Sequence, residues 1–516
     1  MTQTNLFRNR PVAVIGAGVM GIGIVQVALL AGHPVRLYDV REGAAAAAAE
    51  QLAATLAKLA DKGKLTPEDV AAARARLSIA TSLADLRDAA LVIEAIVENL
   101  GVKQALMRDL EAIVAHDCVL ASNTSSLSIT AVARGLEVPG RVVGMHFFNP
   151  VPLMRLVEVV SGLATEPAVA DAIAMLAADW GKAAVHTKST PGFIVNRIAR
   201  PFYAETLALL QEQAATPAVL DACVRGAGFR MGPCELMDLI GHDTNFAVTQ
   251  SVYEANFFDK RYQPSLVQRE MVDGGLLGRK SGRGFYRYPE GGGKTDDGAV
   301  EATPLPVVPL VLHGDDAIAD LLASRLVASG LGFTREPARE GGASRLGLGD
   351  GWLMPTDGRC AAECAHALGT GDVALFDWPV GPAAAGSATP VVPLAWTHAA
   401  QASAEFATQA AEVLRALGWQ PQRLSDVPGL VVARTIAMLV NEASDAVEQG
   451  VCDAAGADAA MTLGVNYPAG PFAWLAQRGA PATVRLLDAL DAFYRGERYR
   501  VSPRLRRATW SAGTTA

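Results

Sequence analysis

Short hydrophobic runs alternate with longer helical patterns in the first third of the chain. The runs have the length of strands and cover residues 12–15, 35–38, 91–94, 118–122, 141–148 and 156–160. Alternation of this kind predicts a parallel sheet with helices packed on both faces. We therefore expect an α/β fold that begins with a doubly wound sheet.

An alanine-rich helical pattern over residues 42–76 interrupts this alternation. It breaks at Lys62-Gly63-Lys64 and restarts at Thr66-Pro67. Thr66 suits the N-cap of the second helix, and Pro67 suits its first position. The segment is predicted to be a helical hairpin with a basic tip.

The second half of the chain contains a repeat. Helical patterns dominate from residue 191 to about residue 288, strand-like runs return at 307–313, 373–376 and 391–396, and residues beyond 428 are again helical. Three dipeptides recur in the same order and at a nearly constant offset: Pro191-Gly192 as Pro428-Gly429, Gly232-Pro233 as Gly470-Pro471, and Arg261-Tyr262 as Arg498-Tyr499. A duplicated helical domain is predicted.

Composition narrows the class of protein. Of 516 residues, 50% are hydrophobic and 19% are charged, which excludes wholesale disorder. A net charge of −8 argues against a nucleic-acid binder. Six cysteines without a CxxC pair favour neither disulfides nor a metal site, so a reducing cytoplasm is expected. Residues 11–35 are uncharged and long enough to span a membrane, but their glycine cluster fits strand–turn–helix better.

The glycine cluster has the spacing of a dinucleotide fingerprint. Gly16-Ala-Gly18-Val-Met-Gly21 follows a predicted strand and opens a predicted helix, and the next strand ends in Asp39. The glycines permit a tight turn and a close approach of the backbone to a pyrophosphate, while the carboxylate of Asp39 suits ribose hydroxyls. NAD is therefore preferred to NADP, although the nearby Arg41 leaves NADP open.

The fingerprint, the element pattern and the repeat together predict five segments along the chain. We predict a Rossmann domain with the hairpin insertion at 8–190, a helical domain at 191–288 and a linker at 289–304. A degenerate Rossmann-like segment at 305–420 and a second helical domain at 421–507 follow.

Candidate catalytic residues lie on two later predicted strands. His146 precedes a proline turn at a predicted strand end, where ligands gather in doubly wound sheets. Glu158 interrupts an apolar run, and a buried carboxylate there requires a partner. Pairing would let Glu158 fix the tautomer of His146 and stabilise its protonated form. A packed histidine and a solvent-facing glutamate are the alternative. Helix capping is likewise the alternative for residues 122–126, a run of short hydrogen-bonding side chains.

Together these motifs resemble the L-3-hydroxyacyl-CoA dehydrogenase family over residues 10–290. The ordered signature comprises Gly16-x-Gly-x-x-Gly21, Asp39, Glu94-Ala-Ile-Val-Glu98, Ser122-Asn-Thr-Ser-Ser-Leu127, His146-Phe-Phe-Asn-Pro150, Leu156-Val-Glu158 and Pro191-Gly-Phe-Ile-Val-Asn-Arg197.

The resemblance implies an enzyme that oxidises the 3-hydroxyl group of an acyl-CoA with NAD. It makes His146 the general base and Glu158 its orienting partner. It also implies that Ser125 and Asn196 hydrogen-bond the reacting oxygens and that Asn149 supports the site. The residues implied at the cofactor are Gly16, Gly18, Val19, Met20, Gly21, Asp39, Glu98, Lys103 and Asn123. Lys62 and Lys64 are implied to contact the CoA moiety.

The second half departs from the family pattern. His313-Gly-Asp-Asp316 stands where the glycines belong, and its carboxylates would repel a pyrophosphate. The offset that relates Pro191 to Pro428 carries His146 and Asn196 to Ala383 and Ala433. We expect a remnant without NAD whose helical domain acts as an intramolecular dimer partner, with a homodimer also open.

Two rival functions and the substrate stay open at this stage. A hydroxyacid dehydrogenase with a lysine base is disfavoured, because residues 191–200 contain no lysine. A non-catalytic member of the same fold would not need the intact residue set. Two-copy chains resemble 3-hydroxyadipyl-CoA and 3-hydroxybutyryl-CoA dehydrogenases. A terminal carboxylate would require a cation, for which Arg155, Arg197 and Arg200 are candidates.

Overall fold

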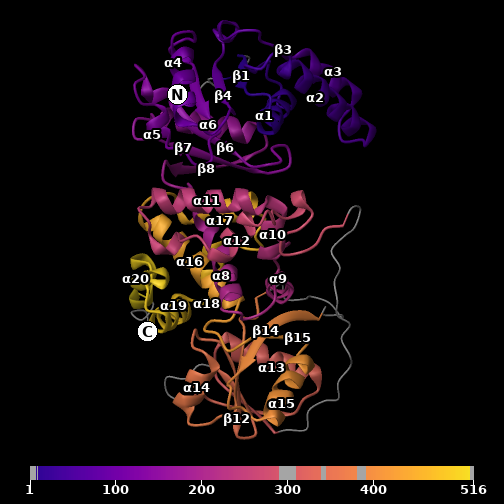
Figure 1. Cartoon of the computed structure of the whole chain (residues 1–516), viewed down its shortest axis with the longest axis vertical. Coiled ribbons are helices and arrows are strands. Elements are labelled where there is room, and N and C mark those ends of the chain that lie inside the picture. The colour runs from indigo at the N-terminus through magenta and orange to yellow at the C-terminus, as the bar shows by residue number, and fades with distance from the viewer. Residues whose placement is uncertain (1–6, 8–9, 290–308, 339–343, 381–390, 512–516) are drawn as a thin grey trace. The chain divides into compact units, whose positions relative to one another are not determined.

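The computed structural model describes residues 7, 10–289, 309–338, 344–380 and 391–511. They form two compact units, one from Met1–Arg197 with Ala446–Asn466 and one from Ile198–Asp445 with Tyr467–Ala516. Most of the predicted linker at 289–304 lies outside the described residues. Figure 1 shows the chain and labels the elements.

The first unit is built on an eight-stranded sheet of order β3-β2-β1-β4-β5-β6-β7-β8. The pairings are parallel except for that of β6 with β7. The strands are β1 (Val12–Ile15), β2 (Val35–Tyr38), β3 (Leu77–Ile79), β4 (Leu91–Glu94), β5 (Val119–Ser122), β6 (Val142–Phe147), β7 (Leu156–Ser161) and β8 (Ala183–Lys188).

Helices cover both faces of this sheet, as the alternating pattern predicts. Alternate residues of each strand enter different cores: Val12 and Val14 pack with α1, α2 and α6, whereas Ala13 and Ile15 pack with α4 and α5. The helices are α1 (Val19–Leu30), α2 (Ala44–Asp61), α3 (Pro67–Ala75), α4 (Leu100–Glu111), α5 (Ile129–Val132), α6 (Pro167–Asp179) and α7 (Val195–Ile198). The doubly wound α/β fold is confirmed.

The hairpin prediction is also confirmed. Helices α2 and α3 pack on each other, and the side chain of Thr66 accepts a hydrogen bond from the backbone N–H of Asp69. The uncharged stretch at 11–35 is strand β1, a turn and helix α1. Within the described part of the chain, no helix has the length and apolar character needed to cross a bilayer.

One helix of the second copy packs on the first sheet. Helix α17 (Ala454–Gly464) lies against β7 and β8, and the backbone N–H of Lys188 in β8 donates to the carbonyl of Val451. A Cβ atom on Gly464 would lie 2.6 Å from the side chain of Leu156 in β7. Glycine is therefore required for this close approach.

The second unit contains the first helical domain and most of the second. The first copy contributes α8 (Arg200–Gln211), α9 (Pro217–Gly226), α10 (Pro233–Ile240), α11 (His242–Ala255) and α12 (Leu266–Asp273). The second copy contributes α16 (Val432–Glu448), α18 (Pro471–Arg478), α19 (Ala480–Tyr494) and α20 (Pro503–Ser511). The helical character predicted for both segments is confirmed.

A smaller mixed sheet completes the second unit, with the order β10-β9-β11-β12-β13-β14-β15. Its strands are β9 (Leu310–His313), β10 (Phe333–Glu336), β11 (Arg345–Leu348), β12 (Gly351–Pro355), β13 (Val373–Phe376), β14 (Val392–His398) and β15 (Trp419–Arg423). Helices α13 (Ala317–Ser329), α14 (Ala361–Leu368) and α15 (Ala404–Ala416) pack on it. Strand β11 runs antiparallel to both of its neighbours, so the nucleotide fold is reduced here.

The contacts of α9 mirror those of α17. Helix α9 packs on β14, and a Cβ atom on Gly226 would lie 2.3 Å from the carbonyl oxygen of Pro393. Gly226 and Gly464 are related by the same offset as Gly232 and Gly470 of the repeat. Each sheet is therefore contacted by a helix from the helical domain of the other half.

Candidate functional site

The glycine loop joins β1 to α1 at the carboxyl edge of the first sheet. Gly16 has φ +106°, and a Cβ atom there would lie 2.5 Å from the carbonyl oxygen of Ala95. A Cβ on Gly21 would collide with the carbonyl of Gly16, whereas one on Gly18 would meet nothing within 4 Å. The loop therefore packs closely against the protein at Gly16 and Gly21 and leaves open space at Gly18. This space and the N-terminus of α1 suit the pyrophosphate of a dinucleotide.

Asp39 stands directly after β2 and faces this loop. Its Oδ2 atom accepts a hydrogen bond of 2.8 Å from the backbone N–H of Ala17. The guanidinium of Arg41 also donates to both carboxylate oxygens, at 3.0 Å each. Hydrogen bonding to Arg41 lowers the pKa of Asp39 to about 2. The carboxylate is therefore ionised at neutral pH, and Arg41 is bound to it.

A cluster of charged and hydroxyl groups lies beyond β4 and β5. Glu98 Oε1 accepts hydrogen bonds from Thr124 Oγ1 at 2.5 Å and from the Ser125 N–H at 3.0 Å. Burial alone would raise the pKa of Glu98, but the hydrogen bond from Thr124 and the charge of Lys103 lower it. Lys103 is 1% exposed and contacts Glu98 at 3.3 Å. The side chain of Lys103 is therefore buried next to Glu98 and does not lie on the surface of the loop.

Glu94 is a member of this cluster for which the sequence analysis predicted no role. Its carboxylate is fully buried and contacts Lys103 Nζ at 2.8 Å through both oxygens. Ser122 also donates to it. The sequence signal that could have indicated this role is an acidic residue at the end of an apolar strand, because a buried carboxylate requires a partner.

Three valines at the same edge are unusually exposed. Val19 at the start of α1, Val40 after Asp39 and Val97 after β4 are 72%, 85% and 66% exposed. Large apolar side chains at the carboxyl edge of a doubly wound sheet suit the flat faces of nucleotide rings. The sequence analysis singled out Val19 but not Val40 or Val97, because exposure cannot be deduced from residue type.

His146 and Glu158 are brought together by the antiparallel pairing of β6 and β7. The two residues are directly opposite in register, and His146 Nδ1 lies 2.6 Å from Glu158 Oε2. His146 is 6% exposed and Glu158 is fully buried. The alternative of a solvent-facing glutamate is therefore wrong for Glu158.

The second oxygen of Glu158 is held as well. Oε1 accepts backbone N–H groups of Ile194 at 3.0 Å and Val195 at 2.9 Å, at the start of α7. The turn before them contains Phe193 with φ +47°, and its ring lies 5.8 Å from the ring of His146. The carboxylate is thus fixed from both sides, which fixes the orientation of the imidazole.

The other predicted site residues lie on loops and helix starts of the same unit. Asn123 Oδ1 accepts the N–H of Phe147, next to His146. Ser125 is half-buried beside Glu98, Asn149 is exposed after β6, and Asn196 is half-buried in α7. Helix α5 is capped by Ser128, whose side chain accepts the N–H of Ala131. Lys62 and Lys64 are exposed at the tip of the α2–α3 hairpin.

The reduced sheet places an acid at the position that corresponds to His146. The register of β13, β14 and β15 aligns Asp377 with His146 and Ala395 with Glu158. The expectation of Ala383 is therefore wrong, because the connection from β13 to β14 is longer than that from β6 to β7. Ala383 itself lies outside the described residues.

Asp377 retains the backbone contacts of Glu158. It accepts N–H groups of Val431 at 2.9 Å, Val432 at 2.7 Å and Ala433 at 2.8 Å. The repeat relates Val431 and Val432 to Ile194 and Val195 of the first copy. The carboxylate that stabilises this turn persists, whereas the imidazole is absent.

The N-terminus of α13 is occupied by a side chain of the protein. Asp316 Oδ1 accepts the N–H groups of Ile318 and Ala319, at 3.0 Å each. These are the groups that a pyrophosphate would require. The carboxylate of Asp316 thus acts as the helix cap of α13.

Comparisons with known proteins match the whole architecture. The NAD-binding domain of 3-hydroxyacyl-CoA dehydrogenase matches residues 11–190, and the C-terminal domain of that enzyme matches twice, at 192–288 and 429–512. The reduced Rossmann-fold domain of 3-hydroxybutyryl-CoA dehydrogenase matches residues 353–428. The predicted duplication and the degenerate nucleotide fold are confirmed.

Full-length relatives share the two-copy organisation. The 3-hydroxyadipyl-CoA dehydrogenase of Escherichia coli K12 is 42% identical over 96% of each chain. A crystal structure of 3-hydroxybutyryl-CoA dehydrogenase from E. coli K12 superposes with a TM-score of 0.86 at 40% identity, covering 98% of this chain and 99% of that one.

A shorter relative matches the first half alone. The probable 3-hydroxybutyryl-CoA dehydrogenase of Bacillus subtilis is 43% identical over 54% of this chain and 98% of its own length. The first half of this chain thus corresponds to nearly the whole length of this relative. With family domains matching nearly all of its length, the chain belongs to the 3-hydroxyacyl-CoA dehydrogenases, which are NAD-dependent oxidoreductases.

Proposed function

We propose that His146 is the general base that removes the proton from the 3-hydroxyl group of an L-3-hydroxyacyl-CoA. The observation that carries this assignment is the contact of 2.6 Å between His146 Nδ1 and Glu158 Oε2. Because Nδ1 is engaged, Nε2 is the ring nitrogen that takes the substrate proton. Glu158 fixes the tautomer and stabilises the charge that the ring acquires.

Bound NAD supplies the acceptor for the hydride that leaves C3 of the substrate. Ser125 and Asn196 orient the reacting oxygen, and Asn149 supports them. Asp39 and Glu98 hold the two riboses of the cofactor, with Lys103 positioning Glu98. Lys62 and Lys64 at the hairpin tip bind the phosphates of CoA by charge attraction.

The acyl group is proposed to be 3-hydroxyadipyl in preference to 3-hydroxybutyryl. The full-length E. coli relative named for 3-hydroxyadipyl-CoA supports this order, whereas a full-length E. coli crystal structure and the shorter B. subtilis relative are named for 3-hydroxybutyryl-CoA. We further propose that the protein acts in the cytoplasm and that its two helical domains replace the dimer of single-copy relatives. The mirrored contacts of α9 and α17 support the latter.

The test is NADH oxidation with acetoacetyl-CoA by the full chain and by His146→Gln. The wild type should turn over, and the variant should lose about 10²- to 10⁴-fold in kcat while still binding NADH. Equally slow or absent turnover in the two proteins would favour the non-catalytic role, and rapid turnover by both would show that His146 is not the base.

A further inference from the structure

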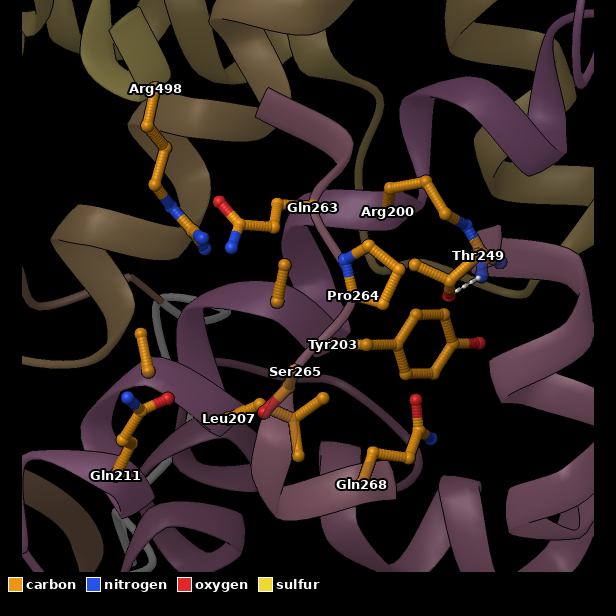
Figure 2. Close-up of a pocket in the computed structure, with 12 residues that line it drawn as sticks. Arg200, Tyr203, Leu207, Gln211, Thr249, Gln263, Pro264, Ser265, Gln268 and Arg498 are labelled. Atoms are coloured by element: carbon orange, nitrogen blue, oxygen red, sulfur yellow. Dashed lines mark hydrogen bonds between the residues drawn. The ribbon is translucent and has the colours of Figure 1, made fainter. Parts of the chain in front are cut away.

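A segment of the second copy forms part of the unit that carries His146 and Glu158. Residues 446–466 belong to this first unit, and they include α17. The copies are also interleaved in the second unit. There, Figure 2 shows Arg498 of the second copy in the wall of a cavity of about 200 Å³ whose other lining residues, such as Arg200 and Tyr203, come from the first copy. In both units, therefore, one copy completes a structure that the other copy builds.

Helix α17 packs on the face of the first sheet that carries the side chain of Glu158. Side chains alternate between the two faces along a strand, so Leu156 and Glu158 of β7 share a face, and Val185 of β8, which pairs with Glu158, shares it too. Cβ atoms on Gly464 and Gly456 of α17 would lie 2.6 Å from Leu156 and 2.8 Å from Val185. A helix of the second copy thus covers the face on which this buried carboxylate lies.

The same segment contacts the turn that holds this carboxylate. Val195 donates its backbone N–H to the carboxylate at 2.9 Å, and a Cβ atom on Gly464 would lie 3.1 Å from Val195 Cγ2. Two residues further on, Arg197 is 5% exposed and donates to Gln449 Oε1 at 2.9 Å. Residues of the second copy therefore contact α7 on both sides of Asn196.

The contact between Arg197 and Gln449 has a counterpart in the remnant half. By the offset of the repeat, Arg197 corresponds to Arg434 and Gln449 corresponds to Glu212. Arg434 contacts Glu212 at 3.4 Å. The contact between the copies thus occurs twice, with an amide as the acceptor in one half and a carboxylate in the other.

We infer that the second copy positions the candidate site of the first, with Gly464 and Gln449 as positioning residues for Glu158 and Asn196. The inference rests on the proposed function, which assigns roles to Glu158 and Asn196. Gly464 allows α17 to approach the turn that holds the carboxylate, and Gln449 fixes the end of α7 through Arg197. Accurate placement matters because a displacement of about 1 Å in a positioned group can lower a rate by about 10²-fold.

The test measures kcat and KM for NADH oxidation with acetoacetyl-CoA by full-length Gly464→Ala. The added Cβ atom would lie about 1 Å closer to Leu156 than ordinary van der Waals contact allows, so the neighbouring strand and turn must shift. The value of kcat should fall by about 10- to 100-fold, while KM and the affinity for NADH change little. Leu156→Val removes the Cδ2 atom that the added Cβ would meet, and it should restore most of kcat in the double variant.

Gly226→Ala is the matched control, because Gly226 and Gly464 are equivalent in the repeat. A Cβ atom on Gly226 would lie 2.3 Å from the carbonyl oxygen of Pro393, in the half that lacks the imidazole. This variant should keep the wild-type kcat even though its melting temperature falls. Melting temperatures also verify that each variant is folded.

A second pair of variants tests the other contact. Gln449→Met removes the acceptor for Arg197 and should lower kcat by about 3- to 10-fold. Gln449→Glu should retain most of the activity, because a carboxylate accepts the same hydrogen bond at the equivalent place in the other half.

A wild-type kcat in folded Gly464→Ala, a loss expressed only in KM, or an equal loss of kcat in Gly226→Ala would overturn the inference. If Gly464→Ala does not fold, the variants of Gln449 decide: an unchanged kcat in Gln449→Met, or equal losses in Gln449→Met and Gln449→Glu, would overturn it. Failure of the proposed function would show separately, as rapid turnover by His146→Gln or no turnover by the wild type.

Discussion

Glu205 and Glu442 occupy the same place in the two copies, and each is bound by the other copy's arginine. Glu205 in α8 contacts Arg498, whereas Glu442 in α16 contacts Arg261 at 3.1 Å. The offset from Glu205 to Glu442 is identical to that from Arg261 to Arg498. Both carboxylates are fully buried. The two helical domains are therefore joined by reciprocal ion pairs, as the halves of a symmetric dimer would be.

Glu205→Gln should destabilise the second unit by about 3–5 kcal/mol, because the buried Arg434 loses this carboxylate and keeps the longer contact of 3.4 Å with Glu212, while Arg498 loses the carboxylate it contacts. Arg434 Nε lies 2.6 Å from Glu205 Oε2 and is 1% exposed. Urea denaturation measures the free energy of unfolding. Asp488→Asn removes an exposed pair with Arg506 and should change it by less than about 1 kcal/mol. A similar small change in Glu205→Gln would contradict the importance assigned to the pair.

Ending the chain after residue 289 should yield a protein that does not persist as a stable monomer. The truncation removes both arginines that neutralise Glu205, and it exposes the face of α8 that packs in the interior of the second unit. Sedimentation and NADH oxidation by this fragment provide the measurement. A monomeric, stable and fully active fragment would refute the intramolecular dimer.

Glu158→Gln should lower kcat by about 10²- to 10⁴-fold with little change in KM. The amide retains an oxygen for the N–H groups of Ile194 and Val195, but it carries no charge to stabilise protonated His146. Glu137→Gln is the control, because Glu137 is exposed on the same domain. A parallel rise in KM and loss of NADH affinity would instead point to a purely structural role for Glu158.

Asp39→Ser should shift the preference between the two cofactors toward NADP. The carboxylate suits the ribose hydroxyls and repels a 2′-phosphate, and its removal frees Arg41 to bind that phosphate. The ratio of kcat/KM for NAD over NADP should fall by about 10- to 100-fold. In the wild type, KM for NAD should stay flat from pH 8 to pH 5, since the pKa of Asp39 is about 2. An unchanged ratio of kcat/KM would indicate that Asp39 does not contact the ribose of the cofactor.

Asp377 should make folding of the second unit depend on pH. Burial raises its pKa to about 6, despite the N–H groups of the turn. A raised folded-state pKa favours folding below the unfolded value near 3.8, and that contribution is lost as pH rises through about 6. Relative to Asp377→Asn, the wild type should lose about 2 kcal/mol between pH 4 and pH 7. A constant difference across this range would show that Asp377 does not titrate there.

The central strands could be predicted from sequence because both faces of the sheet are buried. Residues 12–15 are a continuous apolar run, and 35–38 and 91–94 are apolar except for Arg36 and Glu94; the three segments match β1, β2 and β4. Strands β3 and β8 were missed, since edge strands here carry exposed polar residues such as Ser78 and Lys188. Strands β10, β11, β12 and β15 were missed in the reduced domain, where runs are short and β11 reverses direction.

Pairing across the site was predictable only in part. Glu158 stood out as an acid in an apolar strand, and His146, at the end of the preceding predicted strand, was predicted to be its partner. The contact of Glu94 with Lys103 joins a strand to a helix nine residues later, a separation that no local periodicity marks. Asp377 was found only from strand register, because a longer loop breaks the constant offset of the repeat.

The helix cap formed by Asp316 shows what the covalent link between the copies makes possible. In an assembly of two identical subunits, any amino-acid replacement occurs at both sites, so a nucleotide pocket cannot be closed in one without closing the other. A single gene that encodes both halves removes this constraint. In the second half of this chain Asp316 accepts the N–H groups at the start of α13, and the expected stoichiometry is one dinucleotide per polypeptide.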